Sequence, residues 1–352
     1  FLNNRLNVSF DAYIRDTKDM LMAGKTLPGV YGASSPRMNV ADLRTKGWEA
    51  SVTWGDSFTL ASKPFNYRIM AGIGDNTSKV TKYDNPNRTL TDPYEGQQLG
   101  EIWGYVVDGY FKTDEEARNY KVDQSFVNQM INASALDNGL HAGDLKFVDL
   151  DGNNKIEQTT SANDRKDMKV IGNSLPRYNY NFGISADWYG IDFSVLFQGI
   201  GKQNWYPGAE TSMFWGPYSR PYASFIPSDF MSQVWSEENT NAYFPRPRGY
   251  VALGSNRELA VVNTKYLQNL AYCRLKNLSI GYTLPDKWLS KIGFEKIRVY
   301  FSGENLLTFT KLHSDYIDPE QASASNSWKT SKSDANIYPW AKTYSFGVDI
   351  TF

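Results

Sequence analysis

The sequence predicts an all-β fold, in which an antiparallel up-and-down β-barrel spans a membrane and carries long loops on one side. Three features of the sequence support this prediction. Apolar and polar residues alternate with a period of two, the connections are long and short in turn, and the face opposite the apolar one is polar and small. Successive side chains of a strand point to opposite faces, so this alternation indicates strands. In a membrane barrel the apolar face meets lipid and the polar face lines the interior.

The composition excludes several other classes of protein. The chain has 352 residues, a mean hydropathy of -0.51 and 15% aromatic residues. A net charge of -1 gives no electrostatic reason to expect nucleic acid as the main partner. No stretch approaches the roughly 20 continuous apolar residues that a membrane helix needs, and the apolar content is too high for a disordered chain. A hydrophilic chain rich in aromatics is expected if only one face of each strand touches lipid.

The first three predicted strands cover residues 3–18, 44–55 and 64–82. In each of them every second residue is apolar, and these residues are Leu6, Val8, Phe10, Ala12 and Ile14, then Trp48, Ala50, Val52 and Trp54, then Phe65, Tyr67, Ile69, Ala71 and Ile73. This pattern places one apolar face on each strand.

The fourth and fifth predicted strands, residues 175–188 and 190–200, show the alternation most clearly. Even positions from Tyr178 to Trp188 are apolar or aromatic, whereas the odd positions between them are Asn, Gly, Ser or Asp. In the next strand the apolar positions are odd, and Leu196 is the exception. A tight turn of two residues, 189 and 190, is expected between the two strands.

The last three predicted strands cover residues 264–283, 295–310 and 341–352. In the first of them Leu275 and Leu278 fall on opposite parities, so we expect a bulge or an extension beyond the membrane. The final strand alternates most regularly, with Tyr344, Phe346, Val348, Ile350 and Phe352 on one face.

Long and short connections follow one another along the chain. The long ones are residues 19–43, 83–174, 201–263 and 311–340, and the short ones lie near 55–63, 189–190 and 284–294. An up-and-down barrel with elaborated loops on one side produces this order. Aromatic residues also recur at strand ends, as in the girdles at membrane interfaces: Trp48, Trp54, Tyr178 and Trp188.

Five segments resemble one known family. Residues 275–285 read Leu-Lys-Asn-Leu-Ser-Ile-Gly-Tyr-Thr-Leu-Pro, residues 297–310 read Ile-Arg-Val-Tyr-Phe-Ser-Gly-Glu-Asn-Leu-Leu-Thr-Phe-Thr, and residues 344–352 read Tyr-Ser-Phe-Gly-Val-Asp-Ile-Thr-Phe. Residues 104–111 and the acidic segment 143–156 add two more markers. In this order they resemble the C-terminal part of the SusC/RagA-type TonB-linked (TonB-dependent) outer membrane proteins of Bacteroidetes.

The resemblance implies that residues 1–352 form the C-terminal portion of one barrel domain, the last eight of 22 strands. The plug domain and the TonB-contacting segment are then expected outside this sequence, and the long loops are expected outside the cell. It further implies import of a nutrient oligomer, a glycan or a peptide, together with a SusD-like surface lipoprotein and with energy from the TonB complex. The strand that ends at Phe352 resembles the signal read by the outer-membrane assembly machinery, although a final lipid-facing strand would show the same pattern.

No catalytic group stands out in the sequence, and we expect no enzyme activity and no organic cofactor. The single cysteine, Cys273, is far in sequence from both histidines, His141 and His313. Two other functions remain open at this point. One is a surface or secreted β-protein that binds glycans through loop aromatics, and the other is a passive porin.

The acidic segment contains a candidate structural Ca²⁺ site. Positions one, three, five, seven and nine of an EF-hand-type loop are occupied by Asp149, Asp151, Asn153, Lys155 and Glu157. Two departures stand against it, Asn154 at the glycine position and Thr160 at the position of the final glutamate. Another carboxylate would have to complete the shell, such as Asp144, Asp164 or Asp167. The alternative is a polar turn held by its own Asx hydrogen bonds.

Aromatic residues in the expected loop 201–263 form a second candidate site. They are Trp205, Tyr206, Phe214, Trp215, Tyr218 and Tyr222. If exposed, they would offer rings for a sugar to stack on or a surface for a peptide. The alternatives are packing of loop against loop, or contact with a partner protein, because aromatics dominate buried interfaces.

Overall fold

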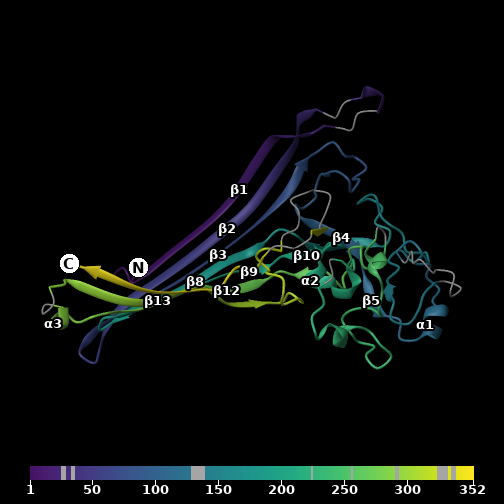
Figure 1. The fold of residues 1–352 in the computed structure, drawn as a ribbon. Helices are drawn as coiled ribbons and strands as arrows, with labels where there is room; N and C mark the ends of the chain where they lie inside the picture. The colour runs from purple at the N-terminus through teal and green to yellow at the C-terminus, as the bar shows by residue number, and fades with distance from the viewer. Residues whose placement is uncertain are drawn as a thin grey trace.

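The molecule is dominated by one long antiparallel sheet, with a cluster of loops and short elements beside one end of its strands (Figure 1). The computed structural model describes the chain except for residues 25–28, 33–35, 128–138, 223–224, 255–256, 290–292, 323–331 and 334–337. Within that part, no helix has the length and apolar character needed to cross a membrane.

Eight strands make up the sheet: β1 (Leu6–Ala23), β2 (Arg37–Leu60), β3 (Lys63–Lys82), β8 (Arg177–Trp188), β9 (Ile191–Lys202), β12 (Tyr272–Thr283), β13 (Lys296–Thr310) and β15 (Thr343–Thr351). Their spatial order is their order in the chain, and every neighbouring pair is antiparallel. The predicted up-and-down arrangement of eight strands is therefore confirmed.

Two tight hairpins join neighbouring strands. Tyr189 and Gly190, between β8 and β9, have φ angles of 49° and 86°, and Ala61 and Ser62, between β2 and β3, have φ angles of 47° and 64°. Two consecutive residues with positive φ suit a type I′ turn, whose twist matches that of the strands. Short turns at this end leave the long connections at the other end.

The first two strands are longer than the sequence suggested. The loop expected over residues 19–43 is shorter, because β1 continues to Ala23 and β2 begins at Arg37. Antiparallel pairing extends from Leu6 opposite Trp54 to Ala23 opposite Arg37, with a bulge near Met20. The two strands thus remain paired through their backbones beyond the last residues that show the apolar alternation. The bulge expected in β12 is confirmed, since the register shifts between Leu275 and Asn277.

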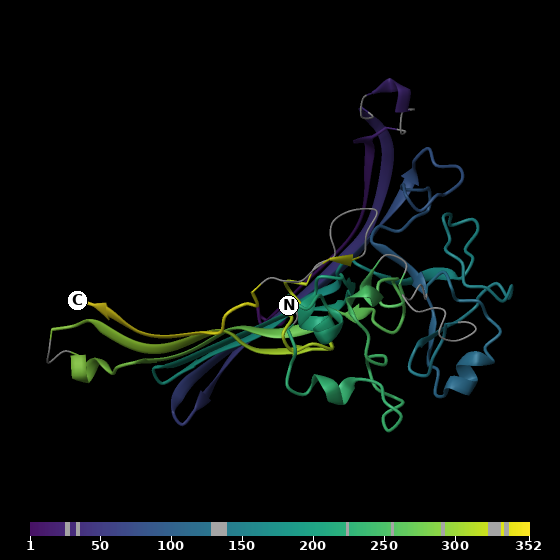
Figure 2. The same cartoon turned by 45° about the vertical axis from the view of Figure 1, so that its right-hand side comes forward.

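Small elements organise the long loops (Figures 1 and 2). They are β4 (Glu101–Tyr105), β5 (Val107–Tyr110), α1 (Asp114–Arg118), β6 (Leu145–Phe147), β7 (Met168–Asn173), β10 (Asn204–Pro207), α2 (Ser212–Trp215), β11 (Gln268–Asn269) and β14 (Lys332–Ser333). A further short helix, α3 (Asp286–Leu289), lies at the other end of the sheet, in the short connection between β12 and β13. β10 pairs with β11 and β14, whereas β4 pairs with β7 and β5 with β6. Segments far apart in sequence are therefore joined through their backbones.

The main hydrophobic core lies among the loops and not between the long strands. Its buried members come from segments as distant as Tyr105 and Ala322. By contrast, large apolar side chains on the strands are exposed, such as Phe10, Ile69 and Phe346. A sheet that leaves its apolar face uncovered needs an apolar medium against that face.

Candidate functional site

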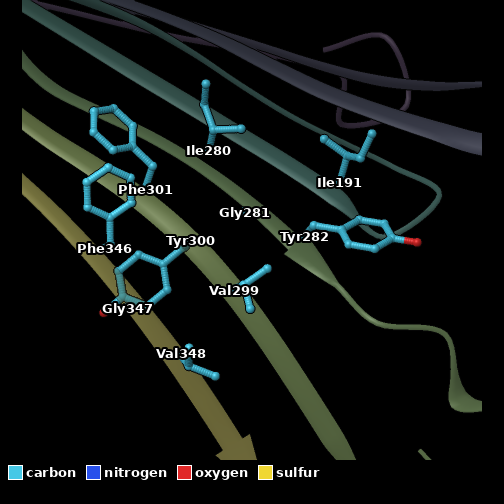
Figure 3. Close-up of a pocket in the computed structure, with 10 residues that line it drawn as sticks. All are labelled: Ile191, Ile280, Gly281, Tyr282, Val299, Tyr300, Phe301, Phe346, Gly347 and Val348. Carbon is cyan, nitrogen blue, oxygen red and sulfur yellow. The ribbon is translucent and has the colours of Figure 1, made fainter. Parts of the chain in front are cut away.

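The apolar face of the sheet forms continuous rows across the strands. Ile280, Phe301 and Phe346 lie opposite one another on β12, β13 and β15, and Figure 3 shows them side by side. The rings of Phe301 and Phe346 are 5.2 Å apart. A shallow groove of about 730 Å³ runs along these rows and along the next, which contains Val299 and Val348. Such a surface suits contact with lipid chains.

The residues of the predicted assembly signal form part of this surface. All five are exposed, namely Tyr344, Phe346, Val348, Ile350 and Phe352. The first four share one face of β15, because no register shift interrupts its pairing with β13, and Phe352 follows the last residue of the strand. Their role as a signal remains a prediction.

The opposite face is polar and carries an ion-pair cluster near the end with the short turns. Arg298 donates to both carboxylate oxygens of Asp192, at 2.8 and 2.7 Å, and to Asp349 at 3.2 Å. Its guanidinium also lies 4.7 Å from the ring centre of Tyr300. Arg298 on β13 thereby joins a carboxylate of β9 to one of β15.

Glycines on the strands accommodate large neighbours. A Cβ on Gly347 would meet the far tip of the Tyr300 ring, which lies directly across the sheet. At Gly199 the obstacle is different, because an added Cβ would meet the backbone carbonyl oxygen of Tyr272. The first neighbour can swing away, whereas the second is fixed by the sheet.

Five of the six loop aromatics are buried, so the expected exposed platform is wrong for them. Trp205, Tyr206, Phe214, Trp215 and Tyr218 are at most 1% exposed. They satisfy their polar atoms internally; for example, the Trp215 indole donates to the Gly208 carbonyl at 2.9 Å. The exception is Tyr222, which is 79% exposed. Packing of loop against loop, the alternative given above, explains the other five.

His313 joins this aromatic core although it lies on a different loop. Its ring stacks on Tyr243 with centroids 3.5 Å apart, and its Nε2 lies 2.8 Å from Oε1 of Gln233. Burial lowers the pKa of the imidazole, an effect that nearby Lys265 reinforces and Asp315 opposes. The neutral ring is therefore the favoured form in the folded loops.

A buried ion-pair cluster fastens the loop before β15 to the sheet. Arg274 on β12 contacts Asp318 at 2.7 Å and Glu320 at 2.6 Å. Asp318 in turn accepts from the Trp340 backbone N–H at 3.1 Å, and Glu320 pairs with Lys276 at 2.8 Å. These contacts hold the loop before β15 against β12.

Asp144 forms a second buried cluster, which the sequence did not reveal. Its carboxylate is fully buried and pairs with Arg246 at 2.7 Å and with Arg248. Asp144 is therefore engaged elsewhere and does not complete the predicted calcium site. The sequence of residues 245–248 does not indicate that its arginines pair with Asp144, because the two regions are about 100 residues apart.

In the acidic segment the structure brings three carboxylates together. Ligand atoms of Asp149, Asp151 and Asp167 lie within 4.8 Å of one another. Asp167 is buried and accepts from the backbone N–H groups of Leu150 and Glu157, at 2.8 and 2.7 Å. Burial raises its pKa, and the negative charges of Asp151 and Asp149 add to this effect. Like charges held this close would be relieved by a cation.

The remaining members of the predicted calcium loop are engaged in other ways. Asn153 accepts from the Lys155 backbone N–H at 2.8 Å, which is an Asx turn. Glu157 lies 3.7 Å from the Lys166 ammonium and 3.9 Å from that of Lys155. The turn alternative therefore describes the backbone of this segment, and the three carboxylates lie beside it.

Comparisons with known proteins agree over the whole chain. It is 28% identical to TonB-dependent receptor P3 of Formosa agariphila, over 99% of the chain and 33% of that protein. It is 22% identical to TonB-dependent receptor SusC of Bacteroides thetaiotaomicron, over 100% of the chain and 31% of that protein. A solved structure of the RagAB peptide importer in its open-open state shares the fold, with a TM-score of 0.69 at 21% identity over 99% of the chain and 33% of that one.

No protein-family model matches the sequence. The chain spans about a third of the length of the proteins it matches.

Proposed function

We propose that this chain, which resembles SusC/RagA-type TonB-dependent receptors over its whole length, forms the wall and outer loops of a nutrient importer in the outer membrane. The observation that carries the proposal is the division of the eight-stranded sheet into two faces. One face is apolar and exposed, as lipid contact requires, and the other is polar, as a solute path requires. The chain would do no chemistry on its cargo.

The cargo is an oligomer, either a glycan or a peptide, and the TonB complex would supply the energy for its uptake. The name of one structural neighbour describes a peptide importer, which makes peptide the first cargo to test. The alternative of a glycan-binding platform built from loop aromatics loses support, because five of the six rings are inside the loop core.

Uptake by whole cells tests the import proposal. Cells with the gene intact, deleted or restored would be given fluorescent oligopeptides and, separately, labelled oligosaccharides. We expect uptake of one class to disappear on deletion, to return on restoration and to require an active TonB complex. Uptake of both classes that is unchanged by deletion would refute import, and uptake independent of TonB would indicate a passive pore.

A SusD-like lipoprotein would sit on the outer loops. Exposed apolar side chains there offer contact area, with Tyr222 at 79% and Ile226 at 55% exposed. Aspartate at both positions should reduce co-purification of the lipoprotein, because an interface core disfavours charge. The matched control is aspartate at Trp288, which is also exposed but lies on α3 at the short-turn end, away from the outer loops. Unchanged co-purification of the Tyr222 and Ile226 variant would contradict this seat.

The acidic segment is proposed to bind a structural Ca²⁺ between Asp149, Asp151 and Asp167. Replacing Asp149 and Asp151 with alanine should lower the melting temperature of the protein when calcium is present but not in a chelator. An equal loss in both conditions would show that the carboxylates only support the turn.

A further inference from the structure

The apolar face of β1, β2 and β3 ends in a group of cations. The pairing register is unbroken from Leu6 to Thr17 in β1 and from Leu43 to Leu60 in β2, so directly opposed residues share a face. At the long-loop end of this face, two rows cross the three strands: Ile14, Lys46 and Thr77 in the first, and Asp16, Arg44 and Lys79 in the second. We call Arg44, Lys46 and Lys79 the cationic rim.

The rim lies at the edge of the surface that would meet lipid. Towards the short-turn end, the same face of these strands is mainly apolar, and its apolar or aromatic residues are Leu6, Val8, Phe10 and Ala12, then Trp48, Ala50, Val52 and Trp54, then Phe65, Tyr67, Ile69, Ala71 and Ile73. The charged positions on this face are Asp75, which is buried and paired with Arg177, and Asp56 and Lys63 near the turn. On the other face of the rim, Thr45 is buried and its hydroxyl lies 2.7 Å from that of Ser78. The rim side chains themselves are exposed.

The charge of the rim is only partly compensated within the chain. Arg44 binds both carboxylate oxygens of Asp16, at 2.7 and 2.9 Å. Neither Lys46 nor Lys79 forms an ion pair with any residue that the structure describes. Arg44 also lies directly opposite Lys79, and like charges in opposed positions destabilise a pair of strands. An anion lying across the rim would remove this repulsion.

We propose that the cationic rim binds the phosphate group of a phosphorylated lipid in the outer leaflet, with its acyl chains on the apolar face below. A phosphate accepts several charge-assisted hydrogen bonds at once, which suits two free ammonium groups beside a guanidinium. The apolar positions of β1 and β2 beneath the rim, and those of β3 beyond the buried Asp75, provide the surface for the chains. A free phosphate ion would use the same cations but would gain nothing from that surface.

Lipid retention tests the proposal. The full-length protein would be placed in phosphatidylethanolamine nanodiscs with a small fraction of lipid A, and lipid A bound per protein would be measured by native mass spectrometry. Each lysine near a membrane surface contributes about 1 kcal/mol towards an anionic lipid, so Lys46→Gln with Lys79→Gln should weaken binding roughly thirty-fold. Lys121→Gln with Lys169→Gln is the matched control, because both lysines are exposed and lie outside the eight-stranded sheet, the first after α1 and the second on β7. Equal retention by the rim variant and the wild type would overturn the proposal, as would inorganic phosphate competing as strongly as lipid A.

The melting temperature gives a second readout, and it also distinguishes a folded variant from a misfolded one. In neutral detergent without lipid A, Lys79→Gln should raise the melting temperature, because it removes the charge opposite Arg44. On addition of lipid A the wild type should gain more stability than the variant. A larger or equal gain in the variant would overturn the proposal. Cargo uptake by the same variant tests import separately, since the rim lies on the lipid side and away from the polar face.

Discussion

Replacing Arg274 with methionine should release the loop that precedes β15 from the sheet. Arg274 holds Asp318 and Glu320, and Asp318 also accepts from the Trp340 backbone. Methionine keeps most of the apolar stem of arginine but removes the charge. The loop would lose the cation that compensates its buried carboxylate.

The magnitude follows from how deeply each partner is buried. The Arg274 side chain is 2% exposed and that of Asp318 is 4% exposed, so Asp318 would be left as a buried charge without a counterion. Breaking such a buried pair costs about 3–5 kcal/mol. Glu320 adds little, because it is 23% exposed and keeps Lys276 at 2.8 Å. Local opening of the loop should therefore become more than about a hundredfold more frequent.

Hydrogen–deuterium exchange of the full-length protein in detergent measures this opening. Amides of residues 312–322 should exchange more than about a hundredfold faster in the variant, whereas amides of β9 should not change. Adding Asp318→Asn to Arg274→Met removes the stranded charge and should recover most of the protection. Unchanged exchange in the single variant, or equally fast exchange in the double variant, would refute the electrostatic clip.

Three further predictions follow from the packing. Gly199→Ala should reduce the yield of folded protein and its melting temperature more than Gly347→Ala, because a backbone carbonyl cannot move aside as a ring can; equal effects would contradict this. Trp215→Ala should destabilise the loop core by about 3–5 kcal/mol. A protease should then cleave loop 203–267 while the strands stay intact, and a loop that stays uncut would contradict the burial argument. The lowered pKa of His313 means that stability is lost as pH falls through the ordinary histidine value of 6.5; melting temperatures between pH 7.5 and 5.5 should show this loss, and His313→Phe should reduce it.

The strands and their faces could be predicted from the sequence because both depend on local geometry. Alternation with period two specifies which side chains share a face, and the opposite parities of Leu275 and Leu278 indicated the bulge now seen between Leu275 and Asn277. Strand ends were less certain. Pairing of β1 with β2 continues beyond the apolar pattern, since backbone hydrogen bonds do not require apolar side chains.

The loops depended on contacts that no local pattern encodes. Trp215 could be recognised as an aromatic residue of a loop, but its burial depends on packing with residues such as Tyr266 and Phe244. The structural role of Asp144 likewise depends on its ion pairs with Arg246 and Arg248, which are distant in the sequence.

The sequence alone thus determined a sheet with one apolar and one polar face, because a strand's side-chain direction is set by its neighbours in the chain. The tertiary structure decided which loop residues remain available to a ligand or partner. It also decided that Asp167, rather than Asp144 or Asp164, lies beside Asp149 and Asp151. Residues far apart in sequence meet only when the loops fold on one another, and their burial depends on that meeting.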